Sequence, residues 1–442
     1  MARQLLDSST GRRVRSSLEQ ALGSRVGRML GMSGLASKPS SSETLLSLAG
    51  ALLSLRGRAS GPALATAFFD CYEASAMAER HAFLGQLHSQ YQQDPQAIDR
   101  AIARWQDKRD EASATALSQA SQSPCERLIN MLNLAPNGTR RLISMRADLL
   151  SAPEITPGLK ALDREFFEAF STWFNAGFLE MRSIDWNAPA AVLERIIRYE
   201  AVHSIEGWDD LRRRVEPADR RCYAFFHPQM ADDPLIFVEV ALTDTIPSAI
   251  HQVIARDRTI IDPKTANCAI FYSISNCQQG LRGIPFGNFL IKQVVGLLKQ
   301  ELPQLHRFAT LSPVPAFARW LAAQGESGVP QGDALRAAAA RFLVTTRDKR
   351  GQVADPVGKF HLGNGARLEA IHIAADLSDK GQRESHGVMV NYLYDLGEIE
   401  SNHVSLFELD TVVHSRAVEE LLNPSSRPRI LRPRRKLAAA AA

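Results

Sequence analysis

The stretch from Cys268 to Pro303, "CAIFYSISNCQQGLRGIPFGNFLIKQVVGLLKQELP", decides the fold of the second half of this chain. It opens with "CAIFYSIS", a run of apolar, aromatic and small residues that is typical of a buried strand. Three glycines follow within a short loop, and from Gly287 to Leu302 apolar residues recur three and four positions apart, which predicts an amphipathic helix. A strand, a glycine-bearing loop and a helix in direct succession predict mixed α/β structure.

Other runs on either side of this stretch predict more elements of the same kind. "PLIFVEVALT" (234–243) and "RFATL" (307–311) read as strands, and the turn "SPVP" opens a helix over "AFARWLAAQ" (316–324). Further on, Asn364-Gly365 predicts a tight turn, and "VMVNYLYDL" (388–396) is an aromatic run.

The first half of the chain shows the helical period instead. Apolar residues three and four apart predict helices over four stretches: "SETLLSLAGALLSL" (42–55), "ATAFFDCYEASAMAERHAFLGQLHSQY" (65–91), "PQAIDRAIARWQDKR" (95–109) and "LDREFFEAFSTWFNAGFLEM" (162–181). We therefore expect an α+β protein: an all-α bundle over 1–182, a mixed α/β domain over 183–425, and a disordered basic tail over 426–442. The closing "KLAAAAA" of the tail resembles a vector remnant.

Composition narrows the classes of function. The apolar and charged fractions of 45% and 23% are ordinary for a globular protein, and a net charge of +4 over 442 residues does not indicate nucleic-acid binding. No apolar run is long enough for a transmembrane helix, so we expect no membrane partner. The five cysteines are scattered without CxxC pairs, which favours free thiols in the cytoplasm, although the Arg- and Ser-rich start could be a weak organelle-targeting segment. The spacing of His, Cys and acidic residues predicts no metal site.

The glycine loop matches neither of the two common nucleotide motifs, because GxxxxGK[ST] and GxGxxG are both absent. Free backbone N–H groups before a helix N-terminus nevertheless suit a pyrophosphate. Glycine is needed there if a side chain would block the backbone conformation or hold the phosphate away. The alternative is a strand-to-helix turn that binds nothing.

The pattern Q-x-x-G-x-[GA] between a strand and a helix resembles the coenzyme A loop of the GNAT acyltransferase superfamily. Seven blocks also occur in an order that resembles the malonyl-CoA decarboxylase family: "EAVHSIEGWDDLRRRV" (200–215), "RRCYAFFHP" (220–228), "PLIFVEVALT" (234–243), "QQGLRGIPFGNFLIKQVV" (278–295), "FATLSPVPAFARWL" (308–321), "FHLGNGA" (360–366) and "NYLY" (391–394). The resemblance covers nearly all of the second half and, more loosely, the helical first half.

The resemblance implies a helical oligomerisation domain, hence a homo-oligomer, followed by a GNAT-like catalytic domain. It also implies that malonyl-CoA is converted to acetyl-CoA and CO2 without a metal or an organic cofactor, coenzyme A being part of the substrate. Fatty-acid and malonate metabolism follow from the same resemblance. The residues expected to bind coenzyme A are Gln278, Gln279, Gly280, Leu281, Arg282, Gly283, Ile284, Pro285, Phe286, Gly287 and Asn288.

Three further residues carry the chemistry by resemblance. Ser312 matches the catalytic serine of the family, although a serine before Pro313 also suits a helix cap. His361 matches the histidine that works with that serine, and an imidazole of ordinary pKa near 6.5 can give or take a proton at neutral pH. Tyr394 matches a supporting phenol, with a core aromatic residue as the alternative. We expect Ser312 and His361 to act as a dyad that stabilises and protonates an enolate.

The sequence departs from the family pattern at one position, and two other functions are compatible with the same loop. Eukaryotic members of the family often carry a glutamate where this chain has Pro285, so a simple three-residue relay is not expected. The rivals are an acyl-CoA N-acyltransferase with the same loop and a non-enzymatic acyl-CoA sensor. A transferase would need an acceptor groove and a base for an incoming amine, and the sequence marks neither.

Overall fold

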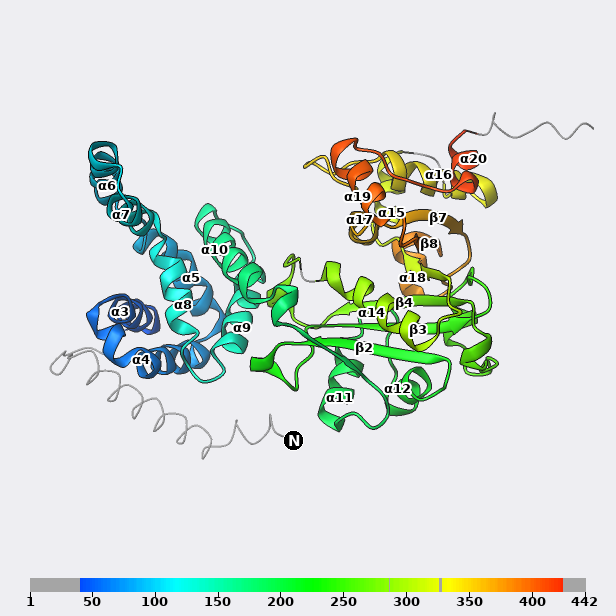
Figure 1. Cartoon of the computed structure of the whole chain (residues 1–442), viewed down its shortest axis with the longest axis horizontal. Helices are drawn as coiled ribbons and strands as arrows, with labels where there is room; N and C mark the ends of the chain where they lie inside the picture. The colour runs from blue at the N-terminus through cyan, green and yellow to red at the C-terminus, as the bar shows by residue number, and fades with distance from the viewer. Residues whose placement is uncertain (1–39, 286, 326–327, 424–442) are drawn as a thin grey trace, which may run out of the picture. The chain divides into compact units, whose positions relative to one another are not determined.

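The computed structural model describes residues 40–285, 287–325 and 328–423 (Figure 1). The described residues form two compact units. The first contains 40–181, 225–236 and 276–287, and the second contains 182–224, 237–275 and 288–423. The expected targeting segment and basic tail, and Phe286 of the expected coenzyme A site, lie outside the described residues.

The first unit is built from helices, as its period predicts (Figure 1). They are α3 (Ser41–Leu53), α4 (Leu55–Ala74), α5 (Met77–Gln90), α6 (Pro95–Lys108), α7 (Glu111–Ser121), α8 (Pro124–Leu132), α9 (Gly138–Leu150) and α10 (Pro157–Trp173). The single run predicted over 65–91 is broken in two, because the Glu79 carboxylate accepts the backbone N–H of Ala76 and starts a new helix there.

The predicted end of α10 is wrong. The helix stops at Trp173, since the Asn175 side chain donates to the Thr172 carbonyl and accepts the Gly177 N–H, which closes a turn in place of further helix. A short 3₁₀ turn, η1 (Ala176–Phe178), and a strand, β1 (Glu180–Ser183), follow. Helical periodicity alone could not show that an asparagine side chain would compete with the backbone at this point.

A mixed sheet organises the rest of the chain (Figure 1). Its strands are β1, β2 (Arg220–Phe226), β3 (Ile236–Thr243), β4 (Cys268–Asn276), β5 (Arg307–Thr310), β6 (Ser312–Pro313), β7 (Arg367–His372) and β8 (Met389–Tyr394). They run in the order β1-β2-β3-β4-β5-β8-β6, with β7 also paired to β8. β4 and β5 are parallel, whereas β8 is antiparallel to β5, β6 and β7. The expected α+β class, a helical bundle followed by a mixed sheet domain, is confirmed.

Helices and short turns connect these strands. They are α11 (Ala190–Tyr199), α12 (Trp208–Val215), η2 (Pro228–Met230), α13 (His251–Ile254), η3 (Pro263–Thr265), η4 (Gln279–Leu281), α14 (Gly287–Glu301), α15 (Phe317–Ala323), α16 (Gly332–Thr345), α17 (Pro356–Gly363), α18 (Asp379–Ser385), α19 (Ile399–Glu408) and α20 (Arg416–Leu422). The opening stretch is therefore β4, a loop that contains η4, and α14, close to its predicted bounds. Within the described part of the chain, none of the helices combines the length and the apolar character needed to span a bilayer.

The two faces of the central strands differ in chemistry, because successive side chains of a strand point to opposite faces. One face is apolar and carries Cys268 and Ile270 of β4, Ala309 of β5 and Met389 of β8 in a single buried cluster. The positions that alternate with these carry Thr310 and Ser312, and Tyr392 and Tyr394 of β8. The second face thus gathers hydroxyl groups on β5, β8 and β6, at one end of the strand order.

Candidate active site

Ser312 lies in β6, paired with Val390 of β8, and only 5% of its surface is exposed. The helix after it begins at Phe317, and its N-cap position is Ala316. The helix-cap reading of Ser312 is therefore wrong. Its hydroxyl instead lies 3.2 Å from Nε2 of His361 and donates to Oγ1 of Thr310 at 2.8 Å.

His361 lies in the last turn of α17, where it is buried against the second face of the sheet. Its ring stacks on Tyr392 with a centroid distance of 4.9 Å and an interplanar angle of 26°. Its Nδ1 lies 2.8 Å from the hydroxyl of Tyr394. The predicted turn at Asn364-Gly365 is the end of this helix, since Asn364 is the C-cap and Gly365 has a φ of +81°.

Tyr394 meets both descriptions that the sequence left open. It is an aromatic residue of β8, buried and packed edge-on against Phe271. Its hydroxyl is also the partner of His361, so the ring belongs to the core while the oxygen belongs to the site. Buried tyrosines normally place their hydroxyl on a partner in this way.

The hydrogen bonds determine which group donates and which group accepts at Ser312 and His361. Thr310 Oγ1 accepts both the Ser312 hydroxyl and the Tyr392 backbone N–H, so Ser312 is a donor to it. His361 Nε2 then carries the ring proton toward Ser312, and Nδ1 accepts from Tyr394. Thr310 was missed at the sequence level. The i, i+2 spacing of two hydroxyl residues in an extended run was the signal that could have found it.

Burial controls the charge of this chain of groups. It lowers the pKa of His361 to about 3, against an ordinary value near 6.5. It also raises the pKa of Tyr394 well above its ordinary value. The expectation of an imidazole with an ordinary pKa is therefore wrong, because an imidazolium that is buried away from water and has no carboxylate beside it among the described residues is not stabilised. At neutral pH the groups Ser312, His361 and Tyr394 are all uncharged.

Asp355 connects the two segments that carry the pair. It is fully buried, and its carboxylate caps α17 by accepting the N–H groups of Val357 and Gly358. The same carboxylate accepts the N–H of Ala316, which follows Ser312 in the chain. The Asp355 side chain therefore links α17, which carries His361, to the segment that follows Ser312, and fixes their relative position.

The glycine loop has its own internal structure. Gln278 precedes η4, and its side-chain amide donates to Asp233 and to the Pro234 carbonyl. Leu281 and Ile284 are buried, whereas Gln279, Arg282, Gly283 and Pro285 are exposed. Gly283 has a φ of +85°, a backbone conformation that favours glycine, and its N–H donates to no acceptor among the described residues.

Gly280 is needed for a different reason from the one the sequence suggested. A Cβ on Gly280 would lie 1.9 Å from the carbonyl oxygen of Ile143 in α9, so any side chain would collide with that helix. It is close packing against α9 that requires glycine here. Gly287 begins α14, as predicted, with Asn288 as its second residue.

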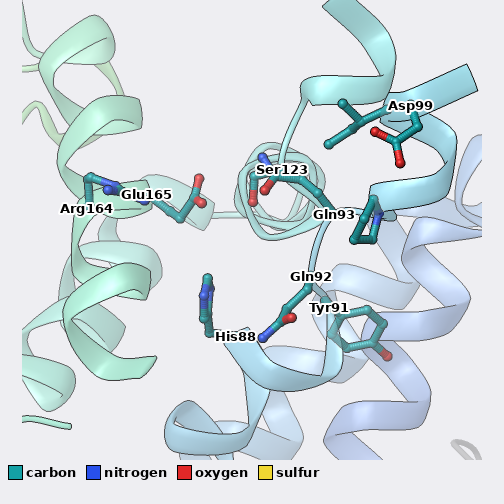
Figure 2. A pocket seen from close by; sticks show the side chains of 10 residues that line it. His88, Tyr91, Gln92, Gln93, Asp99, Ser123, Arg164 and Glu165 are labelled. Carbon is teal, nitrogen blue, oxygen red and sulfur yellow. The ribbon is translucent and has the colours of Figure 1, made fainter. Parts of the chain in front are cut away.

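No group of three or more His, Cys, Asp or Glu side chains in the described part of the chain could hold a metal ion. A cavity of about 480 Å³ lies in the helical unit, with His88, Asp99, Arg164 and Glu165 among its polar lining (Figure 2). None of the residues expected for substrate binding or catalysis borders it.

Buried, uncharged hydroxyl and imidazole groups in hydrogen-bond contact on a mixed sheet can pass a proton from one group to the next, as an enzyme that transfers protons requires. Comparison with known proteins specifies this class. The C-terminal domain of malonyl-CoA decarboxylase matches residues 177–332 and 329–432, and the N-terminal domain of that enzyme matches residues 91–174.

Individual relatives agree with the domain matches. The mitochondrial malonyl-CoA decarboxylase of Mus musculus is 34% identical over 350 residues, which are 67% of this chain and 70% of the mouse protein. The solved malonyl-CoA decarboxylase of Rhodopseudomonas palustris is 43% identical with a TM-score of 0.80, over 86% of this chain and 100% of that one. The Agrobacterium vitis enzyme is 46% identical with the same TM-score, over 86% of this chain and 99% of that one. The chain belongs to the malonyl-CoA decarboxylase family.

Proposed function

We propose that this protein is a carboxy-lyase that converts malonyl-CoA to acetyl-CoA and CO2, with Ser312 and His361 as its catalytic pair and Tyr394 in support. Membership of the family supports the reaction. The observation that carries the assignment of residues is the 3.2 Å contact between Ser312 Oγ and His361 Nε2, in a buried site that also contains the Tyr394 hydroxyl.

The chemistry explains why such groups are needed. When the bond between the carboxylate carbon and Cα breaks, CO2 leaves and the electron pair remains on the thioester as an enolate. A donor in a water-poor site stabilises the developing negative charge on the thioester oxygen, and such a donor typically contributes about 3–4 kcal/mol. One proton must then reach Cα from a positioned acid, and that acid is later reprotonated from solvent.

An uncharged pair fits this order of events. His361, with its pKa lowered to about 3, holds one ring proton at neutral pH and gives the site no positive charge. Ser312 donates to the substrate in place of Thr310, and its proton passes to Cα. The His361 Nε2 proton then replaces it, and one proton taken up from solvent returns His361 to its neutral form, while Tyr394 donates to Nδ1 and fixes the orientation of the ring.

The loop from Gln278 to Asn288 binds the pyrophosphate and the pantetheine arm in this proposal. The exposed N–H of Gly283 and the start of α14 support it, because backbone donors before a helix N-terminus suit phosphate oxygens. Binding energy gained at this remote part of the substrate can hold the malonyl group in the reactive orientation.

The test is whether the protein consumes malonyl-CoA when no amine is present to accept the acyl group. Purified protein is incubated with malonyl-CoA alone, and acetyl-CoA is followed by mass spectrometry beside Ser312→Ala and His361→Ala proteins. We expect turnover in the wild type and at least a hundredfold loss in each variant, since one oxyanion donor or one acid each contributes about that factor. The affinity for coenzyme A should persist in both variants.

The rival functions predict other results. A transferase would need an amine before malonyl-CoA is consumed, and a sensor would bind coenzyme A tightly without consuming malonyl-CoA. Turnover that survives in both variants would remove the dyad but leave the decarboxylase. The proposal includes no metal or organic cofactor, so turnover should be unchanged after dialysis against EDTA.

We further propose a homo-oligomer in a reducing compartment, the cytoplasm. None of the five cysteines forms a disulfide in the described part of the chain. Of the aromatic residues on and after α10, Phe166 and Phe170 are buried within the chain, whereas Phe167 and Phe178 are 39% and 57% exposed and remain available for a subunit contact. Light scattering at micromolar concentration should give a mass above 48.7 kDa, and a monomer mass would contradict the proposal.

A further inference from the structure

The helical unit provides the support of the glycine loop. Arg146 of α9 is 2% exposed, and its Nη1 donates to two loop carbonyls, that of Gly280 at 2.8 Å and that of Arg282 at 3.0 Å. Its Nε donates to Asp163 of α10 at 2.8 Å. A buried guanidinium that satisfies its donors in this way fixes the backbone groups that it binds.

The same helix holds the loop at two further points. Arg140 forms ion pairs with Asp232 and with Asp233, and the carboxylate of Asp233 accepts from the Gln278 side chain. Gly280 packs so closely on the Ile143 carbonyl of α9 that no side chain fits. These contacts come from one helix, and they leave the loop little freedom to rotate its peptide groups.

The contact to Arg282 has a consequence for ligand binding. The carbonyl of Arg282 and the N–H of Gly283 belong to one trans peptide group, and in such a planar group they point in opposite directions. Because Arg146 draws the carbonyl toward α9, the Gly283 N–H points away from α9. It is this N–H that lacks an acceptor among the described residues.

We propose that Arg146 is a positioning residue for substrate binding: from the helical unit, it orients the Gly283 N–H toward the pyrophosphate of the acyl-CoA. The inference rests on the proposed role of the loop in binding that group. It gives the helical unit a part in substrate affinity that is separate from any role in oligomerisation.

The experiment compares two substrates that differ at the pyrophosphate. Malonyl-CoA contains it, and malonyl-pantetheine lacks it while keeping the same reacting thioester. For Arg146→Met we expect kcat/KM for malonyl-CoA to fall about tenfold through KM, because a misdirected N–H loses a charge-assisted hydrogen bond. The kcat/KM for malonyl-pantetheine should stay within about twofold of the wild-type value.

Two more variants distinguish a role of Arg146 in substrate binding from a general effect on folding. Arg146→Lys can reach one of the two carbonyls, so it should fold and lose part of the preference for malonyl-CoA. Arg141→Met is the matched control on the same helix, because Arg141 pairs with Asp70 and Glu73 inside the helical unit and makes neither a hydrogen bond nor an ion pair with the described residues of the loop. The control should lower the thermal midpoint and leave the ratio of the two kcat/KM values unchanged.

The possible results distinguish a failure of the role of Arg146 from a failure of pyrophosphate binding by the loop. A wild-type protein that uses both substrates equally well would show that the loop does not bind the pyrophosphate. A wild type that prefers malonyl-CoA, with folded Arg146 variants that keep the full preference, would overturn the role of Arg146 alone. Equal losses on both substrates would mean that Arg146 has a general structural role, which also contradicts the inference.

Discussion

The imidazole of His361 lies between two tyrosines that differ in their hydroxyl groups. Tyr394 places its oxygen 2.8 Å from Nδ1, whereas the Tyr392 hydroxyl, beneath the stacked ring, is buried without a hydrogen-bond partner among the described residues. The two rings are two positions apart on one strand and are both buried. Each can therefore serve as the control for the other.

Tyr394→Phe should lower kcat about tenfold, because it removes the hydrogen bond that fixes the ring of His361. Tyr392→Phe should leave kcat within about twofold and keep or raise the thermal midpoint, since an unsatisfied buried hydroxyl costs about 1–3 kcal/mol. Steady-state kinetics and thermal unfolding of both variants check this. Equal kinetic losses would mean that packing around the histidine, and not the Tyr394 hydroxyl, supports catalysis.

Among the elements, α17 and the segment after β6 meet at a single carboxylate. Asp355 accepts three backbone N–H groups, and burial nevertheless raises its pKa to about 6. Desolvation outweighs the hydrogen bonds here, because the side chain is enclosed on all sides. The alignment of Ser312 with His361 thus depends on a group that is itself costly to bury.

Asp355→Asn should lower kcat about tenfold with KM within about twofold of wild type, because an amide NH2 replaces one acceptor and releases either α17 or the Ala316 segment. Asp94→Asn is the matched control, since Asp94 caps α6 in the helical unit by the same kind of hydrogen bond. The control should cost stability and leave kcat unchanged. If both variants retain full kcat, Asp355 does not align the pair.

At the scale of the whole molecule, buried histidines make stability depend on pH. Burial lowers the pKa of His203 to about 4 and that of His361 to about 3, so both are neutral in the folded protein at pH 5. Unfolding returns each to an ordinary pKa near 6.5, and the unfolded chain then binds more protons. Their contribution is fully present above about pH 6.5 and is lost as the pH falls below it toward 3–4.

For His361 the loss between pH 7 and pH 5 is about 2 kcal/mol. Asp355 acts in the opposite sense, because its raised pKa favours the folded state at lower pH. His361→Gln should therefore reduce the fall in the free energy of unfolding between pH 7 and pH 5 by about 2 kcal/mol. Denaturant titrations at both pH values measure this, with the exposed His403→Gln as control. An unchanged pH dependence in His361→Gln would show that the imidazole does not have a strongly lowered pKa.

The division into units also belongs to this scale. Residues 225–236 join β2 to β3 and residues 276–287 join β4 to α14, yet both segments group with the helices of the first unit. The reason is local: Arg140 and Arg146 of α9 bind groups in these two segments, and Gly280 admits the helix at close range. The periodicity of apolar residues predicts helices and strands. It does not predict which part of the chain a loop packs against, so it cannot assign a loop to one of the two units.

The sequence by itself determined the elements that follow from local pattern, namely the helices of the first half and the strand, loop and helix of Cys268–Glu301. Its ordered blocks also predicted Ser312, His361 and Tyr394 as site residues. Tertiary structure alone decided how those residues are arranged. It brought Thr310 and Asp355 to the dyad and removed the charge from His361 by burial. It also gave Gly280 a packing role. Each of these depends on distance and desolvation between residues far apart in sequence, which no local pattern encodes.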